Sequence, residues 1–355
     1  MIGEKMSSGK DKIAHIFDIA KANRTPISCT VEVTQKCIFR CPHCFIQGVS
    51  YETLSYSQFI DFINQYKKMG GLYLTLTGGE CLMHPDFKKM YAYAYNHGLA
   101  ITVFTNGYLI DDEIICLFSE KPPRKIEISV YGASEKTYYN ITKIKDSFNR
   151  VINNIDRLIQ SNQNVHLKTV VFSENKKDFY DIKRIALERN LQFKYDFKLM
   201  PMRDGDNSNL TYQLSAPDII QLELDDNPNK LIIWKNKLQE KSLSNGLYMF
   251  SCGAARYSCF LSSENKLRIC ASAIFSEIDL NSNSFSSAWQ AFEKYTLLPP
   301  NKKSKCQECT KAKVCDICPM WGYVMLNSEK NLGEAVDLHC DLANEREMVV
   351  LSEKR

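Results

Sequence analysis

Apolar and polar residues follow two alternating periods over the first two hundred positions. Short runs rich in Val, Ile, Phe, Tyr and Thr, typical of strands, are separated by longer segments with the period of amphipathic helices. The predicted strands are Cys29–Val33, Leu72–Thr77, Ile101–Thr105, Ile126–Val130, Val165–Phe172 and Phe193–Met200, and the predicted helices are Tyr56–Met69, Pro85–His97, Asp111–Phe118, Phe148–Ser161 and Lys177–Arg189. Strands that alternate with helices form parallel sheets, so the pattern predicts an α/β fold of six strand–helix units.

Composition divides the chain further. After Asp204-Gly205-Asp206 the sequence becomes polar and rich in Asn and Pro, and cysteines concentrate beyond Ser251. We therefore predict an N-terminal helical segment at 1–24, a main α/β domain at 25–205, a linker at 206–250 and a metal-stapled domain at 251–355.

Charge and hydropathy exclude several classes of protein. The formal net charge of +4 is small for 355 residues, and positive and negative side chains are interspersed, so a nucleic-acid partner is not predicted. No apolar stretch approaches the roughly 18–20 residues that cross a bilayer. The N-terminal segment 1–12 lacks the apolar core of a signal peptide, so we predict a cytoplasmic protein with no membrane partner.

Three cysteines directly after the first predicted strand carry the strongest chemical signal. Cys37, Cys41 and Cys44 have the spacing C-x3-C-x2-C, and a four-iron cluster held by three thiolates keeps one iron open for a small molecule. The chain has fourteen cysteines, but their grouping and the chain length favour metal ligation over a disulfide framework.

This triad and its position resemble the radical S-adenosylmethionine (SAM) superfamily. The resemblance implies an open, partial (β/α)6 TIM-like barrel, a [4Fe-4S] cluster on the three cysteines, and SAM bound at the open iron. It also implies reductive cleavage of SAM to a 5'-deoxyadenosyl radical that abstracts hydrogen from a substrate. Six strand–helix units agree with this, because they are too few for a closed eight-fold barrel.

Further positions match the SAM-binding pattern of that family. Glu80 ends the motif Gly78-Gly79-Glu80, and the resemblance assigns it to the α-amino group of SAM. Cys81 stands where the family usually has proline; we interpret it as a small residue filling that place, with a reactive thiol as the alternative. His43 either packs on the adenine or is an exposed loop histidine. The predicted SAM contacts are His43, Gly78, Gly79, Glu80, Thr105, Asn106, Ser129, Lys168 and Met200.

Strand alternation predicts a polar barrel interior independently of the family. The strand face toward the helices must be apolar, so the polar face points inward. Ion pairs without a catalytic role explain any single inward charge better than function does, but they do not explain the whole set. The inward set includes Glu32, Glu127, Lys168, Lys194, Asp196 and Lys198. The catalytic candidates are Glu127, Asp196 and Glu32 as bases and Cys81 as a hydrogen donor, while Cys29 and Cys116 are predicted to be structural.

Eight cysteines near the C-terminus suffice for two four-ligand sites. Taken alone, their paired C-x2-C motifs suit structural zinc, but beside the triad they resemble the SPASM domain of radical SAM peptide maturases. Asn265 replaces a common glycine, and the Cys315–Cys318 spacing is one residue short, which leaves open an exchange of these two cysteines or a cluster with an open iron. The resemblance assigns one auxiliary [4Fe-4S] cluster to Cys252, Cys259, Cys270 and Cys318, and the other to Cys306, Cys309, Cys315 and Cys340.

The resemblance as a whole implies a radical SAM/SPASM oxidoreductase that modifies a ribosomally made precursor peptide, through a thioether, carbon–carbon or carbon–oxygen crosslink. The alternatives among enzymes are peptide epimerisation, protein modification of the sulfatase-maturing type and a small-metabolite substrate. Outside enzymes, the alternative is an electron-transfer or zinc-binding interaction protein. About 25 residues precede the first strand, so we expect a separate leader-recognition protein, or leader binding through 206–245, and reduction by a flavodoxin or ferredoxin.

Overall fold

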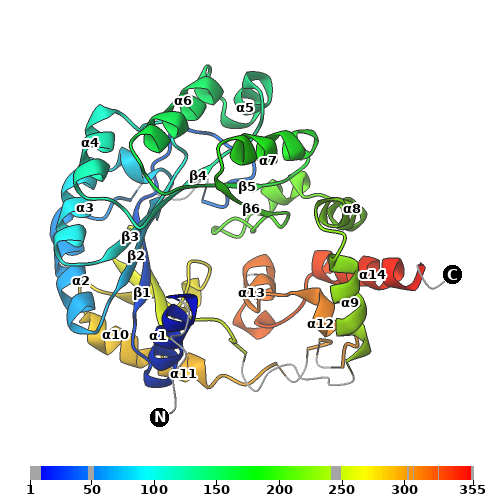
Figure 1. Ribbon diagram of the computed structural model, residues 1–355. Helices are drawn as coiled ribbons and strands as arrows, with labels where there is room; N and C mark the ends of the chain where they lie inside the picture. Colours follow the sequence, from blue (N-terminus) through cyan, green and yellow to red (C-terminus); the bar gives the residue numbers. More distant parts are fainter. Residues whose placement is uncertain are drawn as a thin grey trace, which may run out of the picture.

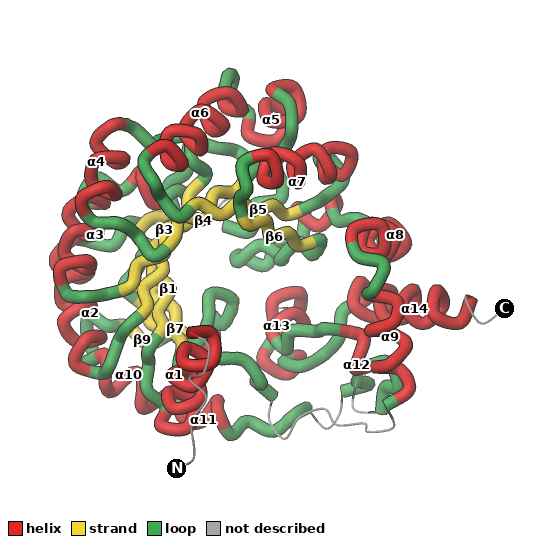
Figure 2. Tube along the Cα trace, viewed as in Figure 1, coloured by secondary structure: helices red, strands yellow, loops and turns green. Residues whose placement is uncertain are grey.

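The computed structural model describes residues 9–46, 52–240, 249–301, 304–306, 308–326 and 328–352. In these ranges nine strands form one sheet with the order β6-β5-β4-β3-β2-β1-β7-β8-β9. The sheet curves into an arc with helices on its outside (Figures 1 and 2), which confirms the predicted α/β fold with a partial barrel. The six parallel strands follow chain order: β1 (Ser28–Thr34), β2 (Tyr73–Gly78), β3 (Ala100–Thr105), β4 (Lys125–Ser129), β5 (Val165–Val170) and β6 (Gln192–Asp196).

Helices join the neighbouring parallel strands. The sequence pattern does not predict α5, because Tyr138 and Ile141 are its only buried apolar side chains and two positions give no periodic signal. By contrast, α2 begins as predicted, since Ser55 and Gln58 form a capping box. After α1 (Gly9–Asn23), the helices are α2 (Tyr56–Lys68), α3 (Phe87–Asn96), α4 (Asp112–Glu120), α5 (Glu135–Thr142), α6 (Ser147–Gln160) and α7 (Phe179–Glu188).

Aromatic rings confirm the alternation predicted along the sixth strand. The rings of Phe193, Tyr195 and Phe197 have centroids 6.5, 5.0 and 5.6 Å from that of Phe179 on α7. Side chains alternate across a strand, so the charged residues between these rings point to the inside of the arc.

The C-terminal part of the chain joins the same sheet. The ring of Phe285 in α10 (Phe285–Ala291) packs against Phe62 and Tyr66 of α2, with centroids 5.6 and 5.8 Å away. Residues 251–291 therefore extend the barrel sheet and its outer layer. The added strands are β7 (Ser258–Leu261), parallel to β1, followed by the antiparallel β8 (Lys266–Arg268) and β9 (Ile278–Asp279).

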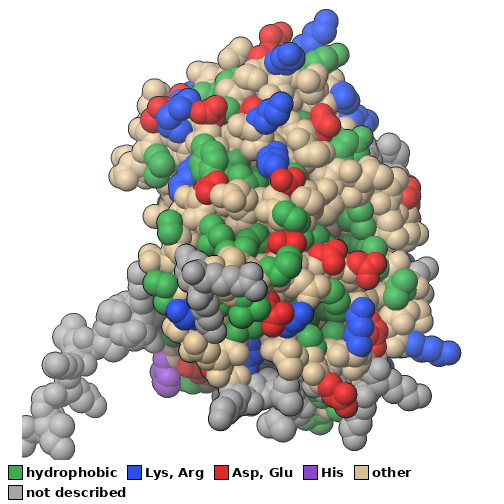
Figure 3. All heavy atoms as spheres, turned by 90° about the vertical axis from the view of Figure 1, so that its right-hand side faces the viewer, with side chains coloured by type: hydrophobic (Ala, Val, Ile, Leu, Met, Phe, Trp, Pro, Cys, Tyr) green, Lys and Arg blue, Asp and Glu red, His purple; other side chains and the backbone are tan. Residues whose placement is uncertain are grey.

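A second core lies across the open side of the arc. Its buried side chains include Trp234, Val314 and Leu342, so the segment predicted as a linker packs against the last cysteine-rich segment. On the face shown in Figure 3, acidic and basic side chains are interspersed. No described helix is long and apolar enough to cross a membrane. The helices of this second core are α8 (Ala216–Asp226), α9 (Lys230–Gln239), α12 (Ala312–Cys315) and α14 (Asp337–Ser352). Of the remaining helices, α11 (Glu293–Thr296) contacts α10, and α13 (Met320–Leu326) precedes α14 in the chain.

Candidate active site

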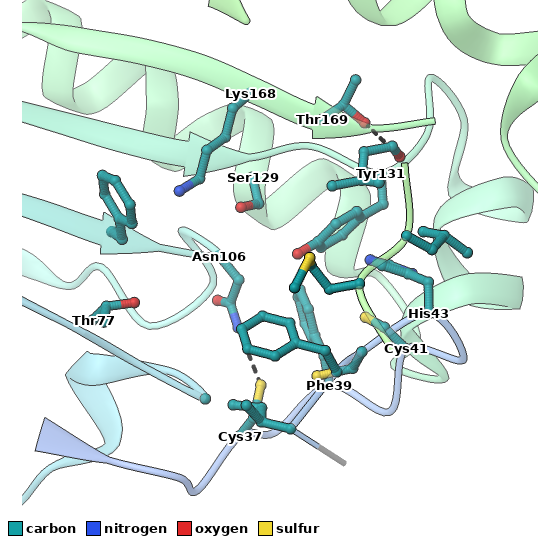
Figure 4. A pocket seen from close by; sticks show the side chains of 18 of the residues that line it. Cys37, Phe39, Cys41, His43, Thr77, Asn106, Ser129, Tyr131, Lys168 and Thr169 are labelled. Atoms are coloured by element: carbon teal, nitrogen blue, oxygen red, sulfur yellow. Dashed lines mark hydrogen bonds between the residues drawn. The ribbon is translucent and has the colours of Figure 1, made fainter. Parts of the chain in front are cut away.

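A cavity of about 640 Å³ lies inside the arc, at the carboxyl ends of the parallel strands. The loop after β1, residues 37–46, forms one wall, and the ends of β2 to β6 form the other (Figure 4). Barrel enzymes carry their active sites at this end, where loops from neighbouring units meet. The structure thus brings the triad and the polar strand ends together in one cavity.

The three thiols of the loop lie close together. Burial, Glu80 and Cys44 raise the pKa of Cys37 to about 12, and burial with the charges of Cys44 and Cys37 raises the pKa of Cys41 well above its usual value. Asn106 Nδ2 lies 3.8 Å from Cys37 Sγ. Thiols that disfavour one another's anions form a site that a cationic metal centre stabilises.

The spacing of the triad suits a four-iron cluster, which spreads three thiolates over three irons and keeps the fourth iron open. The predicted ligands are Cys37, Cys41 and Cys44 in the loop after β1.

Two glycines hold the end of β2 against the triad loop. A Cβ at Gly78 would lie 2.3 Å from Thr34 O, and one at Gly79 would lie 2.4 Å from Gln35 O. Only glycine allows this close approach of two backbone segments. The backbone of both glycines consequently lines the cavity beside Cys37.

Glu80 joins strand ends and does not line the cavity. Its buried carboxylate accepts hydrogen bonds from Leu82 N at 3.0 Å, Thr105 Oγ1 at 2.7 Å and Asn106 N at 2.6 Å. Burial raises the pKa of this carboxyl, and its hydrogen-bond donors oppose the rise. This differs from the predicted direct contact with SAM, because protein donors already occupy the carboxylate. Glu80 instead positions Thr105 and Asn106, which do line the cavity.

Cys81 is buried beneath the site. Its Sγ lies 3.2 Å from Phe104 O, and it is absent from the cavity lining. Burial and the neighbouring Glu80 raise the pKa of this thiol well above its usual value. The structure therefore favours the interpretation of Cys81 as a small residue in the proline position. The predicted hydrogen-donor role is not favoured by this geometry, because the thiol is not among the groups that line the cavity.

Glu32 lies in a buried ion pair. Arg203 Nη1 lies 2.5 Å from its Oε2, and Ser263 Oγ donates to its Oε1 at 3.2 Å. The guanidinium of Arg203 also lies over the ring of Phe45, 5.1 Å from the centroid. This geometry does not favour the predicted role of Glu32 as a base, because its carboxylate is committed to this network and is not part of the cavity lining.

Glu127 is surrounded by lysines. It pairs with Lys125, and its carboxylate lies 3.3 Å from Lys194 Nζ and 3.8 Å from Lys168 Nζ. Burial would raise the pKa of Glu127, but the hydrogen bond from Lys125 and the three positive charges outweigh burial and lower it. A stabilised anion is a poor proton acceptor, so these contacts do not favour the predicted base role of Glu127. Asp196 does line the cavity and stays a candidate base.

His43 belongs to a ring cluster at the cavity wall. Its ring centroid lies 4.3 Å from that of Phe172 and 4.9 Å from that of Tyr131. Burial lowers the pKa of His43 to about 3, so the ring is neutral, and Nδ1 has no hydrogen-bond partner among the described residues. The exposed-loop alternative is excluded, and the site fits an adenine base. Tyr131 directly follows Val130 of the fourth predicted strand, but its role was not predicted.

The remaining predicted SAM contacts line the same cavity. Lys168 of β5 lies opposite Ser129 of β4 in the parallel register, and its Nζ lies 3.3 Å from the ring centroid of Phe104. Burial lowers the pKa of Lys168 to about 8, although Glu127 opposes the change. Figure 4 shows Asn106, Ser129 and Lys168 around one space. The predicted contacts that line the cavity are His43, Gly78, Gly79, Thr105, Asn106, Ser129, Lys168 and Met200.

Seven of the C-terminal cysteines form two groups. Burial and the charges of its neighbours raise the pKa of Cys315 to about 12, and in the same way that of Cys270 to about 11. We call Cys252, Cys270 and Cys318 the first auxiliary group. The second auxiliary group consists of Cys306, Cys309, Cys315 and Cys340.

Cys259 lies apart from both groups. It stands opposite Cys29 in the parallel register of β7 and β1, and burial followed by contact with Cys259 raises the pKa of Cys29. Burial and the charges of both thiols raise the pKa of Tyr66 on α2, so both thiols face the helical layer. Strand alternation turns the side chain of Cys259 to this face, and this geometry does not favour its predicted role as a cluster ligand. The first auxiliary group therefore keeps three thiols.

His339 lies next to the second auxiliary group. It is buried, and neither ring nitrogen has a hydrogen-bond partner among the described residues. Its backbone oxygen lies 3.6 Å from Cys315 Sγ, and its ring packs edge-on against Trp321 at 4.8 Å. Unpartnered buried polar groups are costly, so this site fits a metal centre whose sulfur atoms accept a hydrogen bond.

Comparisons with known proteins agree with the fold and the triad. Residues 31–186 match the sequence profile of the radical SAM superfamily. The AdoMet-dependent heme synthase of Methanosarcina barkeri is 24% identical over 318 residues, which cover 82% of this chain and 90% of that protein. The sporulation killing factor maturation protein SkfB of Bacillus subtilis is 30% identical over 159 residues, which cover 44% of this chain and 38% of that protein.

A solved structure shares the whole architecture. The crystal structure of Streptococcus suis SuiB bound to precursor peptide SuiA has a TM-score of 0.70 at 14% identity, and the match covers 96% of this chain and 83% of that one. The fold is an open partial barrel, and the site at the carboxyl ends of its strands carries three grouped thiols. Residues 31–186 are thus similar to the radical SAM superfamily, and a maturation protein is among the relatives.

Proposed function

We propose that this protein is a radical SAM oxidoreductase that modifies a ribosomally made peptide by hydrogen abstraction and forms a thioether, carbon–carbon or carbon–oxygen crosslink. The observation that carries the proposal is one cavity that joins the triad to Lys198, whose charge acts on Cys318 of the first auxiliary group. A maturation protein among the relatives supports a peptide as the substrate.

The chain's residues hold SAM from three sides in this proposal. A [4Fe-4S] cluster on Cys37, Cys41 and Cys44, with SAM at its open iron, supplies the 5'-deoxyadenosyl radical. The ring cluster of His43, Phe172 and Tyr131 at the cavity wall keeps water from the radical. The contacts that we propose are the backbone of Gly78 and Gly79 for the α-amino group, the ring of His43 for the adenine, and the ammonium of Lys168 for the carboxylate.

An oxidative crosslink must release one electron and one proton after the first hydrogen is abstracted. Abstraction leaves a carbon radical on the peptide. The carbon radical then forms a bond to a second peptide atom. That second atom loses its hydrogen as a proton, and one electron is released as the new bond forms. We propose that Asp196 accepts the proton and that the electron leaves by way of the first and then the second auxiliary group to a flavodoxin or ferredoxin.

Iron content separates Cys270 from Cys259. Three four-iron clusters give about twelve irons per chain after anaerobic reconstitution. We expect about eight irons for Cys270→Ala, which loses a ligand of the first auxiliary group, and about twelve for Cys259→Ala. Iron and sulfide analysis with Mössbauer spectroscopy measures this. A loss of about four irons in Cys259→Ala would make it a ligand, and about four irons plus zinc in the wild type would refute both auxiliary clusters.

The affinity for SAM is expected to fall at high pH through Lys168. Its pKa of about 8 lies below the usual value for lysine, so the ammonium that pairs with the SAM carboxylate is present below pH 8 and lost above it. We expect Kd to rise up to about tenfold per pH unit above 8 relative to Lys168→Met, measured by anaerobic calorimetry. The α-amino group of SAM titrates in both proteins, so the ratio isolates Lys168. A pH-independent ratio would remove Lys168 from the carboxylate site.

A small carboxylic acid is the second candidate substrate. The heme synthase aligns with 82% of this chain, more than the 44% that SkfB covers. The test incubates the reconstituted protein, SAM and reductant with the peptide of a neighbouring short reading frame, and separately with a tetrapyrrole acid. We expect the peptide to lose two hydrogens in its mass spectrum. An unchanged peptide beside a converted tetrapyrrole would refute the peptide substrate, and deuterium uptake from D2O without net loss would indicate epimerisation.

We also propose that a separate protein recognises the leader of the precursor. Its necessity is tested by the affinity of the chain alone for the full precursor and for a leaderless version. Tight, leader-dependent binding by the chain alone would make such a partner unnecessary. In the alternative leader-binding segment 206–245, residues 241–245 lie outside the described residues.

A further inference from the structure

The charges that line the cavity are unbalanced. Four cationic side chains stand against one carboxylate, that of Asp196, and three of these four cations come from the strand side of the cavity. A cavity lined mainly by one sign of charge attracts ligands of the other sign. The cationic side chains are Arg40, Lys168, Lys194 and Lys198.

The carboxylates nearby do not neutralise this excess. Glu127 lies beneath the wall and faces three lysines, with one negative charge against three positive ones. Asp196 Oδ1 accepts a hydrogen bond from the backbone nitrogen of Lys198 at 3.0 Å, which commits that oxygen to the turn. SAM contributes a single carboxylate, and Lys168 takes it in the proposed function.

Lys198 lies where the cavity approaches the first auxiliary group. In the part of the chain that the structure describes, no ion pair within 4.0 Å involves its Nζ. Its charge lowers the pKa of Cys318 and of His339, opposing the burial that dominates at Cys318. Lys194 stands four residues earlier on the same inward face. The two ammonium groups therefore border the cavity that the triad also lines.

We propose that Lys194 and Lys198 bind a carboxylate of the substrate and hold the reacting carbon between the triad and the first auxiliary group. This inference rests on the proposed function and narrows its substrate class to acids. Charge-assisted hydrogen bonds to one carboxylate fix a substrate more firmly than apolar contact alone. Two sources offer this chemistry: an acidic residue or C-terminus of a peptide, and the propionate of a tetrapyrrole.

The experiment uses the full reconstituted chain and two matched probes. A displayed library of random peptides is selected for binding, and metal-free protoporphyrin IX is titrated against its dimethyl ester. The proteins are wild type, Lys198→Met, Lys198→Arg, which keeps the charge, and Lys177→Met, which removes an exposed lysine outside the cavity. Iron content and circular dichroism show that each variant is folded.

We expect the wild type, Lys198→Arg and Lys177→Met to prefer acid over its neutral counterpart by about tenfold or more in one arm, and Lys198→Met to lose that preference. Enrichment of Asp and Glu over Asn and Gln identifies a peptide acid, and tighter binding of the free porphyrin identifies a tetrapyrrole acid. No preference in either arm, or the same preference in Lys198→Met, would overturn the inference. If acids bind but no 5'-deoxyadenosine forms, the carboxylate site stands and the proposed function fails.

Discussion

Replacing Cys41 with alanine is expected to lower the rate of 5'-deoxyadenosine formation at least about 1,000-fold, which corresponds to about 4 kcal/mol. Cys41 is buried in the triad, and two thiolates do not hold a four-iron cluster with a single open iron. The nucleoside is measured by mass spectrometry after incubation with SAM and dithionite under anaerobic conditions. About eight irons should remain per chain, because the auxiliary groups keep their ligands.

Cys116→Ala is the matched control for this prediction. Cys116 is an exposed thiol of α4 whose Sγ lies 3.6 Å from Glu120 Oε1, and it belongs to none of the three groups. Its removal should leave both iron content and nucleoside formation unchanged. Equal losses in the two variants would point to general damage by thiol removal, and normal activity of Cys41→Ala would exclude the triad as the SAM-binding site.

Replacing Arg203 with methionine is expected to lower the free energy of unfolding by about 3–5 kcal/mol. The change leaves Glu32 as an uncompensated carboxylate whose side chain is only 2% exposed. Arg203 also donates its backbone N–H to Phe45 O at 3.0 Å, so the ion pair connects β1 to the triad loop. Denaturant unfolding of the metal-free protein, followed by circular dichroism, measures the loss.

The double variant Glu32→Gln/Arg203→Met separates the charge effect from packing. Once the buried charge is removed, a large part of the stability should return, because the cost arises mainly from the unpaired anion. The guanidinium of Arg203 also lies over the rings of Phe45 and Phe260, and the double variant loses these contacts, so recovery should be incomplete. A double variant as unstable as Arg203→Met would assign the loss to packing and contradict the ion-pair account.

Local patterns in the sequence predict the barrel well because each unit carries its own signal. Strand alternation correctly separates the ring-bearing face of β6 from its charged face. The predicted sixth strand ends too late, since the regular strand ends at Asp196. The Asp196 side chain accepts from the nitrogen of Lys198 and turns the backbone out of the sheet.

The site predictions that the geometry does not favour depend on contacts between distant segments. Glu32 looks like a free carboxylate on an inward face until Arg203, 171 residues later, reaches it. Cys259 looks like a ligand because it completes a set of eight C-terminal cysteines. Its position opposite Cys29 in the register of β7 and β1, however, sets the face of the sheet on which its side chain lies. Glu80 follows the family motif, yet Thr105 and Asn106 of the next strand end take up its oxygens. The spacing of residues along the chain does not reveal these distant partners.

The central claim is that the three thiols of Cys37, Cys41 and Cys44 support reductive cleavage of SAM in the cavity inside the arc. The most direct test is anaerobic incubation of the reconstituted wild-type chain with SAM and dithionite, followed by quantification of 5'-deoxyadenosine. We predict that the nucleoside accumulates with the wild type and not with Cys41→Ala. A wild-type protein with its full iron content that forms no 5'-deoxyadenosine would contradict the claim.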